Sequence, residues 1–233
     1  MPEDTITCNK LHQLLEVQAA RQPDGVALWW NGAAITYASL YQRVLALAAR
    51  LASEGAVGDR VAILAWNCPE FLELIYAVPA SGRILVPLNA RLAPAELSYQ
   101  LQSAGVKTLF GDPQLLAPLL REQGVPPGTA VIDLEERYEQ WLESTAVAPL
   151  PQCDTKDPVW ILYTSGSTGR PKGAVLTHHS FLAGLRSAAL ARPGRHVVCF
   201  TGDGGLGMAL AELETVVRLE LPVVVVVFDD AAL

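Results

Sequence analysis

Short apolar runs alternate with segments of helical spacing through much of this chain. Val61–Ala65 is entirely apolar, and Arg83–Leu88 and Val106–Phe110 are further predicted strands. A strand is apolar throughout when both its faces are buried, as in a parallel sheet covered by helices. The segments between these strands, Pro69–Ala77 and Pro94–Ala104, begin with proline, which is favoured in the first turn of a helix. The sequence therefore predicts an α/β fold with a layered, mostly parallel sheet flanked by helices.

The N-terminal part is predicted to form two helices separated by a β-hairpin. Leu11–Arg21 and Leu40–Ser53 show helical spacing of apolar residues. Val26–Trp30 and Ala33–Tyr37 flank Asn31-Gly32, a dipeptide typical of a two-residue hairpin turn.

The later part continues the alternation of strands and helices. We predict helices at Pro113–Gln123 and His179–Ala191, and a solvated surface at Glu135-Glu136-Arg137. The further predicted strands are Ala130–Leu134, Val159–Tyr163 and Ala174–Leu176, then His196–Thr201 and Pro222–Phe228 around a helix at Met208–Glu220.

Composition excludes some classes of partner. The formal net charge is −7, and no basic run is present that would favour a nucleic acid. The N-terminal residues are polar and acidic, unlike a signal peptide, and the apolar run Leu221–Phe228 is too short to span a membrane. Cysteines at 8, 68, 153 and 199 form no CxxC pair, so we expect free thiols. A soluble cytoplasmic protein is predicted.

One loop, Thr164–Gly173, combines glycine, hydroxyl and cationic residues between two predicted strands. Its glycines allow backbone N–H groups to approach an anion, and its hydroxyl groups can donate to phosphate oxygens. Lys172 supplies a positive charge, and Arg170 adds a second one. The loop is not a Walker A motif, because Lys172 is followed by Gly173 rather than by serine or threonine. The candidate polyphosphate-binding residues are Thr164, Ser165, Gly166, Ser167, Thr168, Gly169 and Lys172.

This loop, continued by Val175 to His178, resembles the signature loop of the AMP-forming adenylate superfamily, which includes acyl-CoA synthetases. The resemblance covers about residues 10–190. The other segments that carry it are Ile35–Leu40, Gly58–Ile63, Asn67, Pro69, Glu70-Phe71, Val86–Asn89 and Arg91-Leu92.

The resemblance implies a two-step reaction with ATP and Mg²⁺ as cofactors. A carboxylate attacks the α-phosphate to give an acyl-adenylate and pyrophosphate, and coenzyme A then takes the acyl group. It further implies that Thr164, Ser165, Ser167, Thr168 and Lys172 hold the β- and γ-phosphates. Such displacements depend mainly on positioning and charge neutralisation.

The later motifs of that family are absent from their expected places. Thr201-Gly202-Asp203 imitates its ribose-binding element, but Thr201 follows Thr164 by only 37 residues, too few for the intervening part of the fold. We therefore expect a truncated ligase that binds ATP weakly and does not complete adenylation.

A second candidate site begins at Gly202, after a predicted strand. Gly202, Gly204 and Gly207 fit a dinucleotide-binding fingerprint, with Asp229 ending the next strand. Asp203 would then face a pyrophosphate directly, which is unfavourable unless a cation lies between them.

The other interpretation supplies that cation. Asp203 and Asp230 each follow one of two neighbouring parallel strands, so both could bind one Mg²⁺ that bridges a diphosphate. Gly202–Asp230 resembles the diphosphate-binding motif of thiamine-diphosphate enzymes such as acetolactate synthase, with Gly202 and Gly204 at the cofactor. That resemblance implies thiamine diphosphate as a further cofactor. An ordinary strand–turn–helix unit remains the alternative.

These resemblances predict two joined domains: a partial AMP-binding domain at 1–192 and a partial thiamine-diphosphate-binding segment at 193–233. The join is either a gene fusion or artificial. The alternatives for function are a thiamine-diphosphate/Mg-binding module of a decarboxylase or acetolactate synthase-like enzyme and a non-catalytic nucleotide-binding module. His178 and His179 follow the loop, and they line a ligand pocket or serve a surface or helix-capping role.

Overall fold

The computed structural model describes residues 8–143, 149–164, 170–183, 197–202 and 223–228. The chain divides into two compact units, residues 1–41 with 178–233 and residues 42–177.

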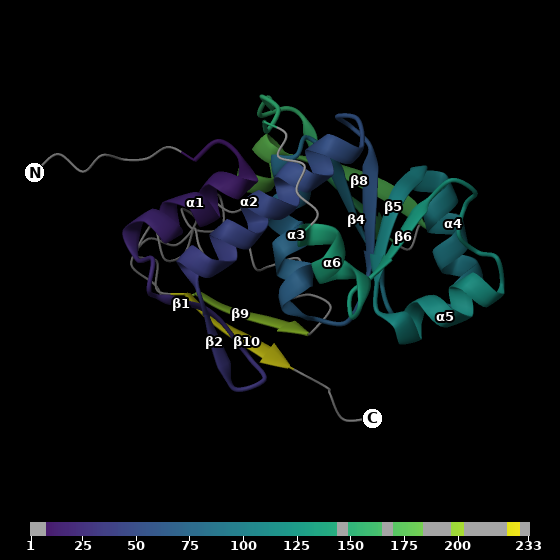
Figure 1. Ribbon diagram of the computed structural model, residues 1–233, viewed down its shortest axis with the longest axis horizontal. Helices are drawn as coiled ribbons and strands as arrows, with labels where there is room; N and C mark the ends of the chain where they lie inside the picture. The colour runs from purple at the N-terminus through teal and green to yellow at the C-terminus, as the bar shows by residue number, and fades with distance from the viewer. Residues whose placement is uncertain (1–7, 144–148, 165–169, 184–196, 203–222, 229–233) are drawn as a thin grey trace, which may run out of the picture. The chain divides into compact units, whose positions relative to one another are not determined.

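The larger unit is built on a six-stranded sheet with the strand order β6-β5-β3-β4-β7-β8 (Figure 1). Its first five strands are parallel, and β8 runs antiparallel to β7 at one edge. The predicted α/β fold with a mostly parallel sheet is therefore confirmed. The strands are β3 Arg60–Leu64, β4 Ile84–Pro87, β5 Val106–Gly111, β6 Ala130–Asp133, β7 Pro158–Thr164 and β8 Lys172–Thr177.

Helices cover both faces of this sheet. Figure 1 shows α4 and α5 on one side of it and α3 and α6 on the other. The helices are α2 Tyr37–Glu54, α3 Pro69–Ala80, α4 Pro94–Ala104, α5 Pro113–Arg121 and α6 Arg137–Glu143.

Alternation along the strands divides the core into two layers. Ala62 and Leu64 of β3 belong to a cluster with Leu97 of α4 and Leu116 of α5. On β5, Phe110 instead contacts the rings of α6, with its centroid 6.0 Å from that of Tyr138. Because neighbouring strand residues point to opposite faces, a buried strand must be apolar at every position, as β3 is from Val61 to Leu64.

Several helices differ from the prediction. Helix α2 begins at Tyr37 instead of Leu40, and α5 ends at Arg121 instead of Gln123. Helix α3 continues through Pro79 to Ala80 instead of ending at Ala77. Proline removes one helical N–H donor, but the end of the helix is closed by Ser81, whose hydroxyl donates to the Val78 carbonyl at 2.7 Å. Helix α6 was not predicted. Glu135-Glu136-Arg137 is exposed as expected.

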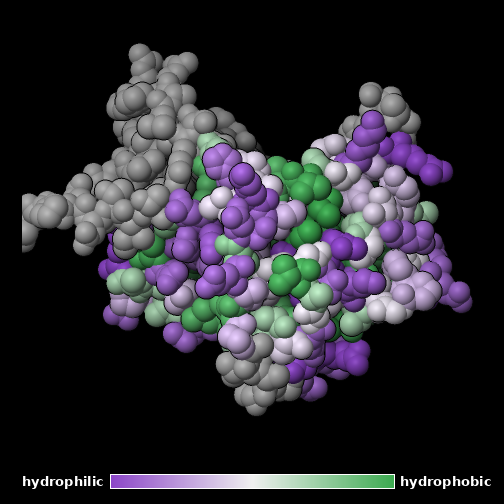
Figure 2. All heavy atoms as spheres, turned by 90° about the horizontal axis from the view of Figure 1, so that it is seen from above, coloured by the Kyte–Doolittle hydropathy of each residue, from purple (hydrophilic) through white to green (hydrophobic). Residues whose placement is uncertain are grey.

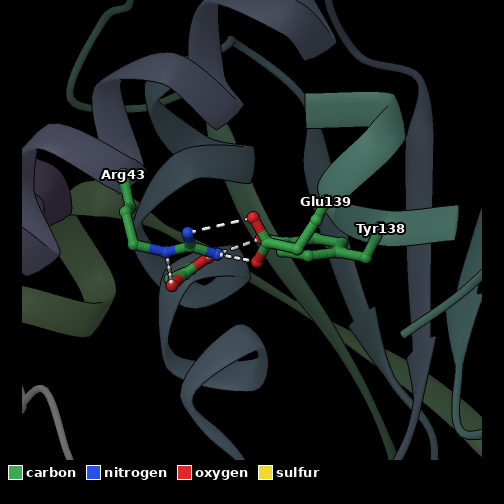
Figure 3. Close-up of polar contacts among 4 residues, drawn as sticks. Arg43, Tyr138 and Glu139 are labelled. Carbon is green, nitrogen blue, oxygen red and sulfur yellow. Dashed lines mark hydrogen bonds and ion pairs between the residues drawn. The ribbon is translucent and has the colours of Figure 1, made fainter. Parts of the chain in front are cut away.

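A polar network connects helices α2, α3 and α6 (Figure 3). Arg43 of α2 forms ion pairs with Glu73 of α3 and Glu139 of α6, each at 2.5 Å. Tyr138 of α6 donates its hydroxyl to Glu73 at 2.6 Å. The Glu73 side chain is only 2% exposed. Burial raises the pKa of Glu73, and the hydrogen bonds from Arg43 and Tyr138 oppose that rise.

The smaller unit contains the predicted hairpin. Strands β1 Val26–Trp30 and β2 Ala33–Thr36 pair antiparallel around Asn31 and Gly32, whose φ angles are 48° and 79°. Positive φ at both turn positions is the geometry of a type I′ turn, which the Asn-Gly dipeptide favours. The unit also contains α1, Leu11–Arg21, as predicted.

Two further strands of this unit pair in parallel. They are β9 Val197–Gly202 and β10 Val223–Phe228, and Val223 lies opposite Val197. The predicted bounds of both strands, His196–Thr201 and Pro222–Phe228, differ from these by at most one residue at each end. The predicted helix between them lies outside the described residues.

Some large apolar side chains of the described residues are exposed. In the larger unit they include Val57, Trp66 and Val175. The face in Figure 2 shows hydrophobic groups in green set among polar groups in purple. Single exposed apolar residues are normal on protein surfaces, so they define no binding surface by themselves.

Candidate functional site

The candidate loop begins and ends on the hairpin of β7 and β8. The last residue of β7, Thr164, lies directly opposite the first residue of β8, Lys172. Since β7 is parallel to β4, this end of the hairpin lies at the carboxyl edge of the parallel strands. Ligands of open α/β sheets bind outside that edge. The predicted position of the loop between two strands is confirmed, and its two ends are brought together.

Positive charge is available at this end of the hairpin. Arg170 and Lys172 are both exposed, as is Thr164. Among the residues that the structure describes, neither cation forms an ion pair. The other predicted phosphate ligands, Ser165, Gly166, Ser167, Thr168 and Gly169, lie outside the described residues.

Helix α4 contacts both arms of the loop. Tyr99 donates its hydroxyl to the carbonyl of Pro171 at 3.3 Å, and its ring lies 5.7 Å from the Arg170 guanidinium carbon. On the β7 side, Tyr163 donates its hydroxyl to the carbonyl of Gln100 at 3.3 Å. Sequence reasoning missed Tyr99 and Gln100. No local motif marks them, because the contact with Pro171 joins residues 72 positions apart.

A close approach of the two strands requires glycine at 173. A Cβ added there would lie 2.7 Å from Cγ2 of Ile161 and 3.4 Å from the ring of Tyr163. Such overlap forces side chains from their preferred rotamers or shifts the backbone.

We expect Gly173→Ala to lower the free energy of unfolding by about 1–3 kcal/mol, the usual cost of overpacking. Equilibrium urea denaturation measures this. The control is the same change in an Ile161→Ala background, where the nearest obstructing methyl group is absent. An equal loss in both backgrounds would show that the Ile161 contact is not the cause.

Of the roles predicted for His178, the structure shows helix capping. It is 1% exposed, and its Nδ1 accepts the backbone N–H of Leu11, the first residue of α1, at 3.0 Å. This bond satisfies one of the N–H groups that a helix leaves unpaired at its start. It also assigns the proton of the neutral imidazole to Nε2. His179 is exposed.

A second imidazole lies beside the first. His12 packs against His178 with the ring centroids 6.1 Å apart in an edge-on arrangement. Burial lowers the pKa of His12 from 6.5 to about 4, with electrostatic repulsion by His178 and then by Lys10 as smaller causes. The folded state therefore holds this residue neutral.

Acidification is expected to destabilise the fold through His12. Because its folded pKa is lowered, the stability present above pH 6.5 is lost as the pH falls toward 4. Between pH 7.5 and pH 5 the loss from this residue is about 2 kcal/mol. Urea denaturation at both pH values measures it, with His12→Gln as the control that removes the titrating group. An identical pH dependence in the control would contradict the assignment.

The second candidate site is described only in part. Strands β9 and β10 are parallel neighbours, as predicted, and Gly202 ends β9. Asp203, Gly204, Gly207, Asp229 and Asp230 lie outside the described residues. Within the described part of the chain, no group of three or more His, Cys, Asp or Glu residues could hold a metal ion.

Comparison with known proteins identifies the family of this chain. The family model of AMP-binding enzymes matches residues 15–226. The fatty acid–acyl-carrier-protein ligase ScoC of Streptomyces coeruleorubidus is 36% identical over 176 residues, which are 74% of this chain and 34% of that protein. The long-chain-fatty-acid–CoA ligase FadD13 of Mycobacterium tuberculosis is 41% identical over 131 residues, which are 54% of this chain and 26% of that protein. The chain thus spans about a third or less of the length of these relatives.

Solved structures agree with the fold. A fatty acyl CoA synthetase of Mycobacterium tuberculosis superposes with a TM-score of 0.74 at 30% identity, over 94% of this chain and 45% of that one. The inhibitor-bound N-terminal domain of FACL13 from the same organism also has a TM-score of 0.74 at 30% identity, over 94% of this chain and 57% of that one.

The mostly parallel six-stranded sheet flanked by helices is the α/β fold of the N-terminal domains of adenylate-forming enzymes. The chain belongs to the family of AMP-binding enzymes, and its relatives include fatty acid ligases and a feruloyl-CoA synthase. ATP use is implied by that family.

Nothing in the comparisons supports the predicted thiamine-diphosphate motif or a fusion, and the family match continues to residue 226. The division into domains at residue 192 stays a prediction. No helix in the described residues is long and apolar enough to cross a membrane.

Proposed function

We propose that this chain binds the β- and γ-phosphates of Mg-ATP at the 164–172 loop and serves the activation of a carboxylic acid. The observation that carries the proposal is the register of the hairpin, which places the exposed Lys172 opposite Thr164 at the carboxyl edge of the sheet. The family match and the two ligase relatives support it.

In the reaction, a carboxylate oxygen forms a bond to the α-phosphorus, and the bond from that phosphorus to the bridging oxygen of pyrophosphate breaks. Negative charge grows on the departing pyrophosphate. The ammonium group of Lys172 is a compact charge that neutralises it, and the Thr164 hydroxyl is a hydrogen-bond donor. Mg²⁺ that arrives with the nucleotide supplies further charge neutralisation.

The second half-reaction would transfer the acyl group to a thiol. The sulfur attacks the acyl carbonyl carbon, and AMP leaves. Coenzyme A is the proposed acceptor, because FadD13 is named as a CoA ligase. ScoC is named instead as an acyl-carrier-protein ligase. A fatty acid is the acid class that both names share.

Two measurements test the proposal. Calorimetric titration with ATP in the presence of Mg²⁺ is expected to show one site, and isotopic ATP–pyrophosphate exchange with a panel of fatty acids reports adenylation. Binding without exchange would fit both the expected truncated ligase and the alternative, a non-catalytic nucleotide-binding module, whereas exchange would exclude that alternative. A chain that binds no Mg-ATP at millimolar concentration would overturn the proposal.

A further inference from the structure

Three contacts attach the ends of the hairpin loop to one helix. Tyr99 of α4 contacts two consecutive residues of the loop's second arm, Arg170 through its ring and Pro171 through its hydroxyl. The next residue of α4, Gln100, accepts the hydroxyl of Tyr163 from the first arm. The two arms are thus tied to adjacent residues of α4.

Helix α4 is packed into the core, so the contacts attach the loop to a well-ordered helix. Its Leu97 and Leu101 are buried at 4% and 0% exposure in the core cluster, and Gln100 is 4% exposed. The helix ends at Gly105, which has the left-handed conformation (φ 63°) that glycine adopts readily at a helix C-terminus. Tyr99 itself is half-buried, so its ring joins this buried helix to the exposed Arg170.

We infer that Tyr99 is a positioning residue that holds the arm Arg170–Lys172 against α4 and so places Lys172 for the triphosphate. The inference rests on the proposed function for the identity of the ligand. Tyr99 lies on helix α4, outside the 164–172 loop and its motif.

The physical reason is the cost of ordering a loop at the moment of binding. A side chain that is already held in place loses less conformational freedom when the ligand arrives. The ring of Tyr99 attracts the guanidinium of Arg170, and its hydroxyl donates to the Pro171 carbonyl. Both contacts lie within two residues of Lys172, so their loss would release the arm that carries the cation.

Two variants separate the contributions of Tyr99. Tyr99→Leu removes both ring and hydroxyl, and Tyr99→Phe removes only the hydroxyl. We expect calorimetric Kd values for Mg-ATP about tenfold weaker for Tyr99→Leu and about threefold weaker for Tyr99→Phe. The same two changes are then made in an Arg170→Met background. There, Tyr99→Phe should still weaken Mg-ATP binding, because the hydroxyl bond to Pro171 is lost. The further weakening caused by loss of the ring should be smaller than in the wild-type chain, because the ring no longer faces a guanidinium. Tyr41→Phe, on α2, is the matched control and should bind as the wild-type chain does.

The attachment is also measured without nucleotide. Amide hydrogen exchange of the peptide 170–177 should be severalfold faster in Tyr99→Leu than in the wild-type chain, with less change in Tyr99→Phe. Faster exchange, weaker ATP binding and partial rescue by phenylalanine would together support the inference. A role in global stability alone would instead speed exchange throughout the core and would not reproduce the dependence on Arg170.

Unchanged exchange in Tyr99→Leu overturns the attachment, whatever the ATP affinity. Faster exchange with wild-type ATP affinity, while Lys172→Ala loses binding, overturns the positioning role. If the wild-type chain binds no Mg-ATP, the proposed function fails by itself, and the exchange measurement alone decides whether Tyr99 holds the arm.

Discussion

Replacing Arg43 with methionine is expected to lower the free energy of unfolding at neutral pH by about 3 kcal/mol, the loss typical of removing one partner of a buried ion pair. The reason is the burial of Glu73, whose side chain is 2% exposed and would keep only the Tyr138 hydroxyl at 2.6 Å. Methionine preserves much of the length of the side chain, so the change tests the charge more than the packing. Equilibrium urea denaturation at pH 7.5 measures the loss.

Glu139 provides the matched control on the same arginine. Its distance to Arg43 is the same 2.5 Å, but its side chain is 51% exposed. Because exposed ion pairs are screened by water, Glu139→Gln should cost less than about 1 kcal/mol. Similar losses for Arg43→Met and Glu139→Gln would show that burial does not decide the strength of this network.

The loss of unfolding free energy caused by Arg43→Met should depend on pH. Burial raises the pKa of Glu73, and without Arg43 less remains to oppose the rise. A raised folded pKa contributes stability that is fully present below the unfolded value of 4.5 and is lost as the pH rises through the folded value. The difference between variant and wild type should therefore be largest at neutral pH and should shrink toward pH 4.5. A deficit that grows on acidification would contradict this sign.

Lys172→Ala is expected to weaken Mg-ATP binding about tenfold to hundredfold, which corresponds to one hydrogen bond to a charged group. The side chain is exposed and forms no ion pair with a described residue. Removing it should therefore change the free energy of unfolding by less than about 0.5 kcal/mol. Calorimetry measures binding, and urea denaturation checks the fold.

Two comparisons make the Lys172 result specific. Lys107→Ala removes an exposed lysine on β5 and should leave ATP affinity unchanged. Lys172→Arg keeps the charge but replaces a compact ammonium with a planar fork, so it should retain part of the affinity. Equal binding by Lys172→Ala and the wild-type chain would remove the residue from the proposed phosphate site.

Much of the fold could be predicted because its signals are local. The Asn31-Gly32 turn needs two residues with positive φ, and the sequence places there the two types that adopt it readily. The apolar run at β3 predicts burial on both faces, which the sheet order then explains. Helix ends were less predictable: α3 passes through Pro79 because the following residues satisfy the carbonyls near its end.

The candidate site was predicted from its own motif, and the structure adds its surroundings. Thr164 and Lys172 are eight positions apart in sequence and directly opposite each other in the hairpin. Sequence alone could not show which helix His178 caps, since it accepts a hydrogen bond from Leu11, 167 positions away.

The sequence by itself determined the alternation of strands and helices, the hairpin turn and the loop that places the chain among AMP-binding enzymes, because each depends on residues close together in the chain. Only the tertiary structure decided that Tyr99 contacts Arg170 and Pro171 and that Glu73 meets Arg43 and Tyr138. These side chains come from different helices and strands, and no local period encodes which of them meet. Packing of the helices on the two faces of the sheet brings them together, and burial then sets how strongly they interact.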